Sequence, residues 1–221
     1  MMNCLRKLSK VAVALTIIFS LSGFGLGNLL PGGGGGGSWT AIVKDWKDGL
    51  GGLAAEAARL GMAQADIADA LGLKQQAALL RGAAKNLAEK GDSAGGADLE
   101  ELGTKSASAQ KAINDKIKNT AKLSAAEKAA IAKGGATVMQ SLVGVGKNVF
   151  LLVMASKAAS SAGAPGVSDL GAVSIVVQIP ELLPKAANVV PQLFETANDL
   201  RKYAAEKDIA VPEAPPQPGW S

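Results

Sequence analysis

Residues 39–71 read WTAIVKDWKDGLGGLAAEAARLGMAQADIADAL, and their pattern decides the fold class. Apolar residues recur here at alternating intervals of four and three, a heptad pattern typical of a helix that packs along its whole length. The positions are Trp39, Val43, Trp46, Leu50, Leu53, Ala57, Leu60, Gln64, Ile67 and Leu71. Glycine weakens a helix, so we expect breaks or very close neighbours at Gly49, Gly51, Gly52, Gly61 and Gly72.

The composition of the whole chain supports a helical fold. Of its 221 residues 48% are hydrophobic, but only 4% are aromatic. A β-sandwich needs more aromatic side chains for packing between strands, whereas alanine, the best helix former, is abundant here. We therefore predict an all-α protein, a bundle of about five or six helices over residues 38–209.

A second heptad seam lies near the other end of the predicted bundle, at 183–204. The two seams could pack on each other or seat a partner helix. The residues that we assign to this candidate helix-packing seam are Trp39, Val43, Trp46, Leu50, Leu53, Leu183, Val190, Leu193 and Leu200.

Helix signals divide the rest of the bundle. We expect helices over 74–90 and 99–122, and a long one from the capping box Ser124–Glu127 to about residue 162. Glycine and proline at 163–166 end that helix. A short apolar helix should follow to Gln178, and a last helix should begin at Pro180 or Pro184 and be kinked at Pro191.

The segment 136–179 forms a predicted central hydrophobic hairpin. Its first half, ATVMQSLVGVGKNVFLLVMA at 136–155, carries one charge, Lys147. Such a helix is buried either in protein or in lipid, so the hairpin is the core of a soluble bundle or a membrane-inserting element. Over 136–179 it resembles the hydrophobic hairpin of pore-forming helical toxins such as the colicins. Gly144–Asn148 lacks the spacing of a P-loop and is better interpreted as small residues that let a helix approach.

The N-terminus has the pattern of a targeting segment. Residues 1–27 contain Arg6, Lys7 and Lys10 followed by the apolar run 11–19, which predicts a cleaved signal peptide. Alternatively, the twenty uncharged residues 11–30 are long enough for an inner-membrane anchor. Residues 28–37 form a flexible Gly-rich linker, and 210–221 a Pro-rich disordered tail. Either way we expect the bundle to be exported, as a periplasmic, secreted or membrane-anchored protein.

Lysines concentrate in one part of the bundle. Residues 105–133 carry seven lysines against Asp115 and Glu127, an excess that could contact anionic lipid or simply be solvated. The candidate membrane-contact residues are Lys105, Lys111, Lys116, Lys118, Lys122 and Lys147. Since arginine and lysine do not otherwise cluster, we expect no nucleic-acid partner.

The chemistry available to the chain is restricted. There is no histidine, and the single cysteine is Cys4, which excludes His-based catalysis and Cys/His zinc sites. We expect no catalytic residue, cofactor or metal. The sequence favours a non-catalytic exported helical protein that binds a protein, a ligand or a membrane surface. The alternatives are a membrane-active protein that inserts 136–179, and an enzyme using carboxylates, such as Asp66 with Asp69 or Glu100 with Glu101, or a Ser–Lys pair.

Overall fold

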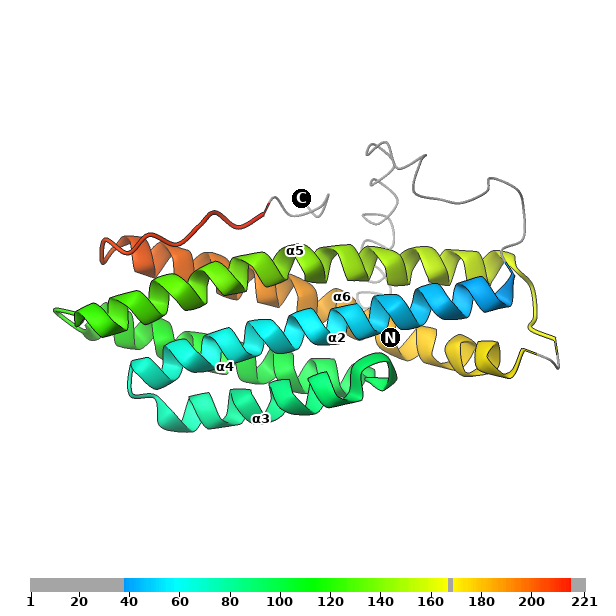
Figure 1. Cartoon of the computed structure of the whole chain (residues 1–221), viewed down its shortest axis with the longest axis horizontal. Coiled ribbons are helices and arrows are strands. Elements are labelled where there is room, and N and C mark those ends of the chain that lie inside the picture. Colours follow the sequence, from blue (N-terminus) through cyan, green and yellow to red (C-terminus); the bar gives the residue numbers. More distant parts are fainter. Residues whose placement is uncertain (1–37, 167–168, 216–221) are drawn as a thin grey trace, which may run out of the picture.

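Helices make up most of the chain that the computed structural model describes, residues 38–166 and 169–215 (Figure 1). These residues form five α-helices and one 3₁₀ turn, with no strand among them. The elements are α2 (Trp39–Ala70), α3 (Lys74–Lys90), η2 (Gly91–Ser93), α4 (Gly96–Asn119), α5 (Ala125–Ser161) and α6 (Leu170–Ala205). The predicted all-α bundle is confirmed. The predicted leader 1–27, the linker 28–37 and residues 216–221 of the tail lie outside the described residues.

The bundle is an elongated rod whose two ends differ in composition. The longest helix, α5, has 37 residues, which corresponds to about 55 Å at 1.5 Å per residue. It pairs with α2 along most of the rod, while α3 packs on α2 and α4 packs on α6 (Figure 1). The shorter α3 and α4 do not reach the end at which α2 begins. That end therefore consists of α2, α5 and α6 alone (Figure 1).

Several predicted helix ends are confirmed in detail. Ser124 Oγ accepts from Glu127 N at 3.2 Å, and Glu127 Oε2 accepts from Ser124 N at 2.7 Å, so the capping box opens α5. The helix predicted over 74–90 is α3. The predicted loop at 91–98 is shorter than expected, because α4 already begins at Gly96.

The helix α6 differs from the prediction. Two helices were expected in this region, separated near Gln178, but α6 runs unbroken from Leu170 to Ala205 with Pro180, Pro184 and Pro191 inside it. A proline removes one helical hydrogen bond. The segment remains helical because its inner side packs on the core: Leu182, Ala186 and Val189 are buried, while Pro180 and Pro184 face solvent.

Glycines allow α2 and α5 to lie very close together. A Cβ added at Gly52 would lie 2.3 Å from Asn148 Oδ1, and one at Gly144 would lie 2.5 Å from Glu56 Cγ. A Cβ at Gly134 would lie 2.5 Å from Ile67 Cγ1. Of the glycines singled out in the sequence, Gly49, Gly52 and Gly61 have the expected close neighbours and Gly51 has ordinary contacts only. The expected break occurs at Gly72, which has a positive φ in the turn after α2. Gly144 likewise has the helix-packing role expected for the 144–148 segment.

Both heptad seams face the common core. All ten seam positions of α2 are buried except Val43, which is half-buried, and in the second seam only Leu183 is half-buried. Leu53 of the first seam and Leu193 of the second line the same small cavity. Both seams are therefore largely buried and meet at this cavity, while α2 packs mainly on α5 and α3, and α6 packs mainly on α4.

The packed chain continues beyond the predicted boundary at residue 209. After α6, Ile209 is buried and Val211 packs against Gly135 on α5. Arg201 Nη2 donates to Glu213 Oε1 at 2.6 Å, which holds the extended segment to α6. Residues 210–215, predicted to belong to a disordered tail, therefore lie along the bundle.

Candidate functional site

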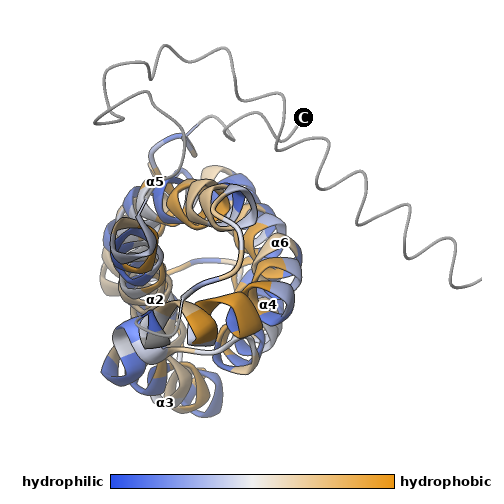
Figure 2. Cartoon of the chain, turned by 90° about the vertical axis from the view of Figure 1, so that its right-hand side faces the viewer, coloured by the Kyte–Doolittle hydropathy of each residue, from blue (hydrophilic) through white to orange (hydrophobic). Residues whose placement is uncertain are grey.

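Three valines on one side of α6 are exposed to solvent. The exposed fractions are 49% for Val173, 43% for Val176 and 70% for Val177. Their spacing of three and four residues places them on one face of the helix, which we call the valine face. Figure 2 looks onto this end of the bundle and shows the apolar start of α6 in orange. Since large exposed apolar side chains in a group often mark a contact surface, the valine face is the candidate site.

The valine face is uncovered because α4 begins too far along the bundle to shield it. The first residue of α4, Gly96, lies against Glu181 and Lys185, so the turns of α6 that precede Glu181 extend past α4. These turns pack only on their inner side. There Trp46 Nε1 donates to Gln178 Oε1 at 3.3 Å, and Gly171 lies beside Val43.

A separate small core supports this end of the rod. Trp39, Ile42, Ala159 and Ala172 form a buried cluster contributed by α2, α5 and α6. Its members are 8% exposed or less. The valine face is therefore displayed on a packed three-helix unit rather than on a single projecting helix.

This end of the bundle is almost free of charge. Between Lys157 and Glu181 the only charged residue is Asp169, and the first charge of α2 is Lys44. Since the predicted leader joins the bundle at Ser38, we call this end the leader end. It comprises residues 38–43, 158–166 and 169–180.

Two helices are long and apolar enough to cross a membrane, judged by length and composition. In α5, 56% of the most apolar 18-residue window is buried inside the bundle, but in α6 only 28% is. The halves of the predicted hairpin thus have different surroundings. The α5 half is core, whereas the α6 half is largely open on one side.

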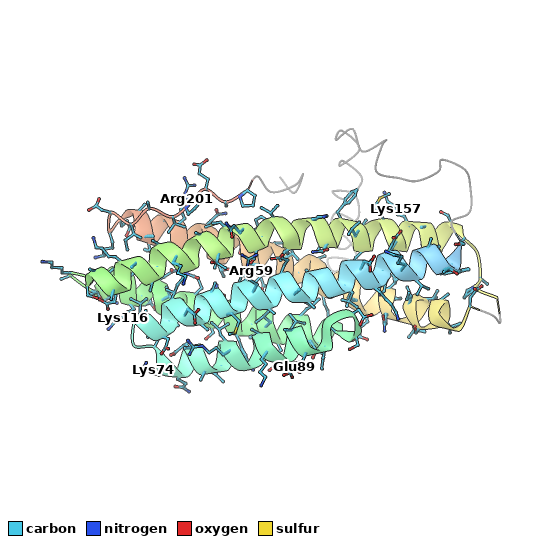
Figure 3. The ribbon with its side chains drawn as sticks, viewed as in Figure 1. Arg59, Lys74, Glu89, Lys116, Lys157 and Arg201 are labelled. Carbon is cyan, nitrogen blue, oxygen red and sulfur yellow. The ribbon has the colours of Figure 1, made fainter. Side chains whose placement is uncertain are left out.

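The predicted membrane-contact lysines do not form one surface. Lys116, Lys118 and Lys122 lie near the α4–α5 turn, at the end of the rod opposite the leader end; Figure 3 labels Lys116 there and Lys157 near the leader end. Lys105 pairs with Glu101, and Lys111 Nζ lies 2.8 Å from Asp115 Oδ2. Lys147 is exposed in the middle of α5.

The candidate catalytic carboxylates are engaged by cations. Arg81 Nη2 donates to Asp66 Oδ1 at 2.9 Å and to Asp69 Oδ2 at 3.2 Å. Hydrogen bonds from Lys74 and then from Arg81 lower the pKa of Asp69. Glu101 pairs with Lys105, and Glu100 lies 3.4 Å from Lys185 Nζ. These carboxylates act as partners in surface ion pairs.

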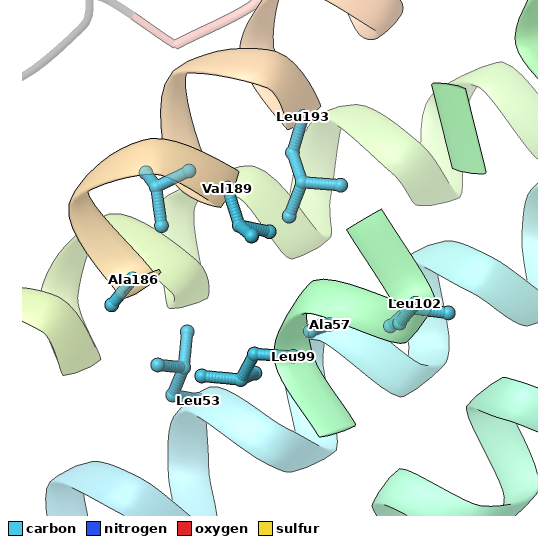
Figure 4. Close-up of a pocket in the computed structure, with 8 residues that line it drawn as sticks. Leu53, Ala57, Leu99, Leu102, Ala186, Val189 and Leu193 are labelled. Atoms are coloured by element: carbon cyan, nitrogen blue, oxygen red, sulfur yellow. The ribbon is translucent and has the colours of Figure 1, made fainter. Parts of the chain in front are cut away.

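Aliphatic side chains make up most of the interior of the bundle. A cavity of about 10 Å³ lies where α2, α4 and α6 meet, between Leu53, Leu99 and Val189 (Figure 4). This is about the minimum space for one water molecule, and only apolar residues line it. It offers no polar group to a substrate.

The structure also reveals a shallow surface groove between α2 and α3 that the sequence analysis missed. Four alanines, one methionine and three cations line it: Ala55, Ala58, Ala84, Ala88, Met62, Arg59, Arg81 and Lys85. All three cations already have partners: Arg59 donates to Gln140, Arg81 to its two aspartates, and Lys85 pairs with Glu89. The alanines recur at helical spacing, a signal that in the sequence is indistinguishable from ordinary core alanine.

A buried polar network joins α2 to α4. Gln64 Nε2 donates to Gln110 Oε1 at 3.0 Å, and Ser106 Oγ donates to Gln64 Oε1 at 2.6 Å. Gln110 Nε2 in turn donates to Asn114 Oδ1 at 2.7 Å. All four side chains are buried. Gln64 was predicted as a seam position, but its buried polar partners were not.

Among the described residues, no group of three or more histidine, cysteine, aspartate or glutamate side chains is placed to hold a metal ion. Compared with known proteins, the chain matches no protein-family model, no curated protein and no solved structure.

Proposed function

We propose that this chain is a non-catalytic, exported protein of the cell envelope that works by binding, with the valine face as its contact surface. The observation that carries the proposal is the group of exposed valines Val173, Val176 and Val177 at the leader end. Leaving such side chains in water is unfavourable, by about 1.5–3 kcal/mol for each fully exposed valine relative to full burial. A partner that covers them recovers part of this free energy.

A binding role fits the remaining surfaces better than catalysis does. An enzyme site needs a concave pocket with converging polar groups. The small interior cavity near Leu53 is lined only by apolar residues. Asp66 and Asp69, the nearest approach to a carboxylate pair, both bind Arg81.

In-cell photocrosslinking tests the proposal. A benzophenone amino acid is placed at Val177 in the full chain, and, as a matched control, at Val143, which is 57% exposed on α5. We expect a specific crosslinked product, to protein or to lipid, from position 177 and not from 143. Equal and low crosslinking at both positions would contradict a contact role for the valine face.

Insertion of the hairpin 136–179 is the second candidate function, favoured by the sparse cover over the start of α6. Insertion requires α5 to leave α2, and the close contacts at Gly52, Gly134 and Gly144 oppose this separation. Dye release from anionic vesicles tests it. Insertion predicts leakage that increases in Gly134→Ala, because this change weakens the α2–α5 contact. The binding proposal instead predicts sealed vesicles at every pH.

A further inference from the structure

We propose that the valine face is seated on a lipid bilayer, so that the rod is held to the membrane by its leader end and projects away from it. This inference rests on the proposed binding function and names its partner. The argument uses the place where the leader joins, the distribution of charge along α6 and the position of the lysines.

The point of entry of the leader limits how far the valine face can lie from a membrane. Residues 11–30 carry no charge and are long enough to span a bilayer. Seven residues, 31–37, separate them from Ser38, and seven residues reach at most about 25 Å. The chain enters α2 at the end where α6 begins (Figure 1). A retained leader would therefore hold the valine face next to the bilayer.

The chemistry of the leader end suits the apolar part of a bilayer. No charged residue occurs from 170 to 180, and the last turn of α5 and the first turn of α2 add only uncharged residues. A charged side chain in this position would resist entry into lipid, because charges are costly to dehydrate. Within the leader end Asp169 is the single charged residue, so this cost is confined to one side chain.

Charge also limits how far the contact extends along α6. Beyond Pro180 the exposed residues of the helix include Glu181, Glu195 and Asp199. Carboxylates are repelled by anionic headgroups and remain hydrated. The bilayer contact therefore ends at about Pro180, and the rod does not lie flat along α6.

The lysines at the far end agree with this orientation. Lys116, Lys118 and Lys122 lie near the α4–α5 turn, about 55 Å from the leader end if the 37 residues of α5 measure the rod. They are consequently too far from the bilayer at the leader end to touch it. In this orientation these three lysines do not make the first contact between the hairpin 136–179 and lipid.

Spin labelling of the full chain in vesicles tests the inference. Single cysteines replace Val177, Val143 or Lys118 in a Cys4→Ser background, and the labelled chains are reconstituted into vesicles of phosphatidylethanolamine and phosphatidylglycerol. Relaxation by oxygen and by a water-soluble nickel complex is compared at each site. We expect oxygen to dominate at 177 and nickel to dominate at 143 and 118. Val173→Asp with Val176→Asp should shift the label at 177 to the behaviour of 143, with an unchanged helical circular dichroism spectrum.

Three results would overturn the inference. Nickel dominance at 177 would place the valine face in water. Low access to both agents would mean that protein covers it, and spin–spin broadening at 177 would identify that protein as a second copy of the chain. Low access to both agents, with or without spin–spin broadening, would reject the bilayer as the partner but leave the proposed binding function standing. Nickel dominance at 177, together with no crosslink from this position, would reject both the bilayer contact and the binding function.

Discussion

At the scale of single residues, the closest packing of the rod depends on glycines that a sequence cannot distinguish from helix breakers. Gly134 illustrates this, because its missing side chain makes room for Ile67 Cγ1, and the Ala63 carbonyl oxygen lies 3.1 Å from an added Cβ. The backbone carbonyl cannot move aside as a flexible side chain can. The glycine thus sets the distance between α2 and α5.

We expect Gly134→Ala to destabilise the protein by about 1–3 kcal/mol, the usual cost of overpacking a core. The matched control is Gly82→Ala in α3, since an added Cβ there meets nothing within 4 Å. This second change should stabilise the protein by about 0.5–1 kcal/mol, because alanine favours the helix. Urea unfolding followed by circular dichroism measures both, and a Gly134→Ala variant at least as stable as the wild type would refute the close contact.

The buried amides supply a second prediction at this scale. Gln64→Leu leaves the Ser106 hydroxyl and the Gln110 carbonyl oxygen without Gln64 as their partner. An unpaired buried polar group costs about 1–3 kcal/mol. Replacing Gln110 by leucine as well removes one of these groups, so the double variant should lose less stability than the sum of the two single variants. A strictly additive double-mutant cycle would show that the network is not coupled.

At the scale of elements, an ion-pair cluster joins the end of α2 to α3. Asp69 accepts hydrogen bonds from Lys74 at 2.7 Å and from Arg81 at 3.2 Å. Because these donors lower the pKa of Asp69 in the folded state, the unfolded chain takes up its proton at a higher pH. The contribution of Asp69 to stability is therefore complete at neutral pH and is lost as the pH falls through the folded pKa.

We accordingly expect Asp69→Asn to lower the urea midpoint at neutral pH and to have little effect by about pH 2, below the usual carboxylate range. Asp199→Asn, at an exposed position on α6, serves as the control and should change the midpoint little at either pH. An effect of Asp69→Asn that is equal at both pH values would contradict the pairing.

The elements also indicate how much could be predicted from the sequence. The Ser124–Glu127 capping box and the heptad of α2 are local patterns, and local patterns identified α5, α3 and α2 closely. The local proline signals at 180 and 184 predicted a helix start, but α6 continues because its inner face packs on the core. The exposure of Val177 depends on where the first residue of α4, Gly96, lies relative to α6. No local pattern contains that information.

At the scale of the whole molecule, the rod has two unlike ends. The leader end presents the valine face and very few charges, while the opposite end carries the exposed Lys116, Lys118 and Lys122. The rod between them is held by continuous packing of α2 on α5. If the leader end is seated on a bilayer as proposed, the rod keeps the lysine-bearing end about 55 Å from the lipid.

Neutron reflectometry of the full chain in a supported bilayer tests this account most directly. If the leader end is seated on the lipid and the rod projects, the protein layer should extend about 50 Å from the bilayer, close to the length of the 37-residue helix α5. A layer of only about 20–25 Å, the thickness of two packed helices, would mean that the rod lies flat and would contradict the account.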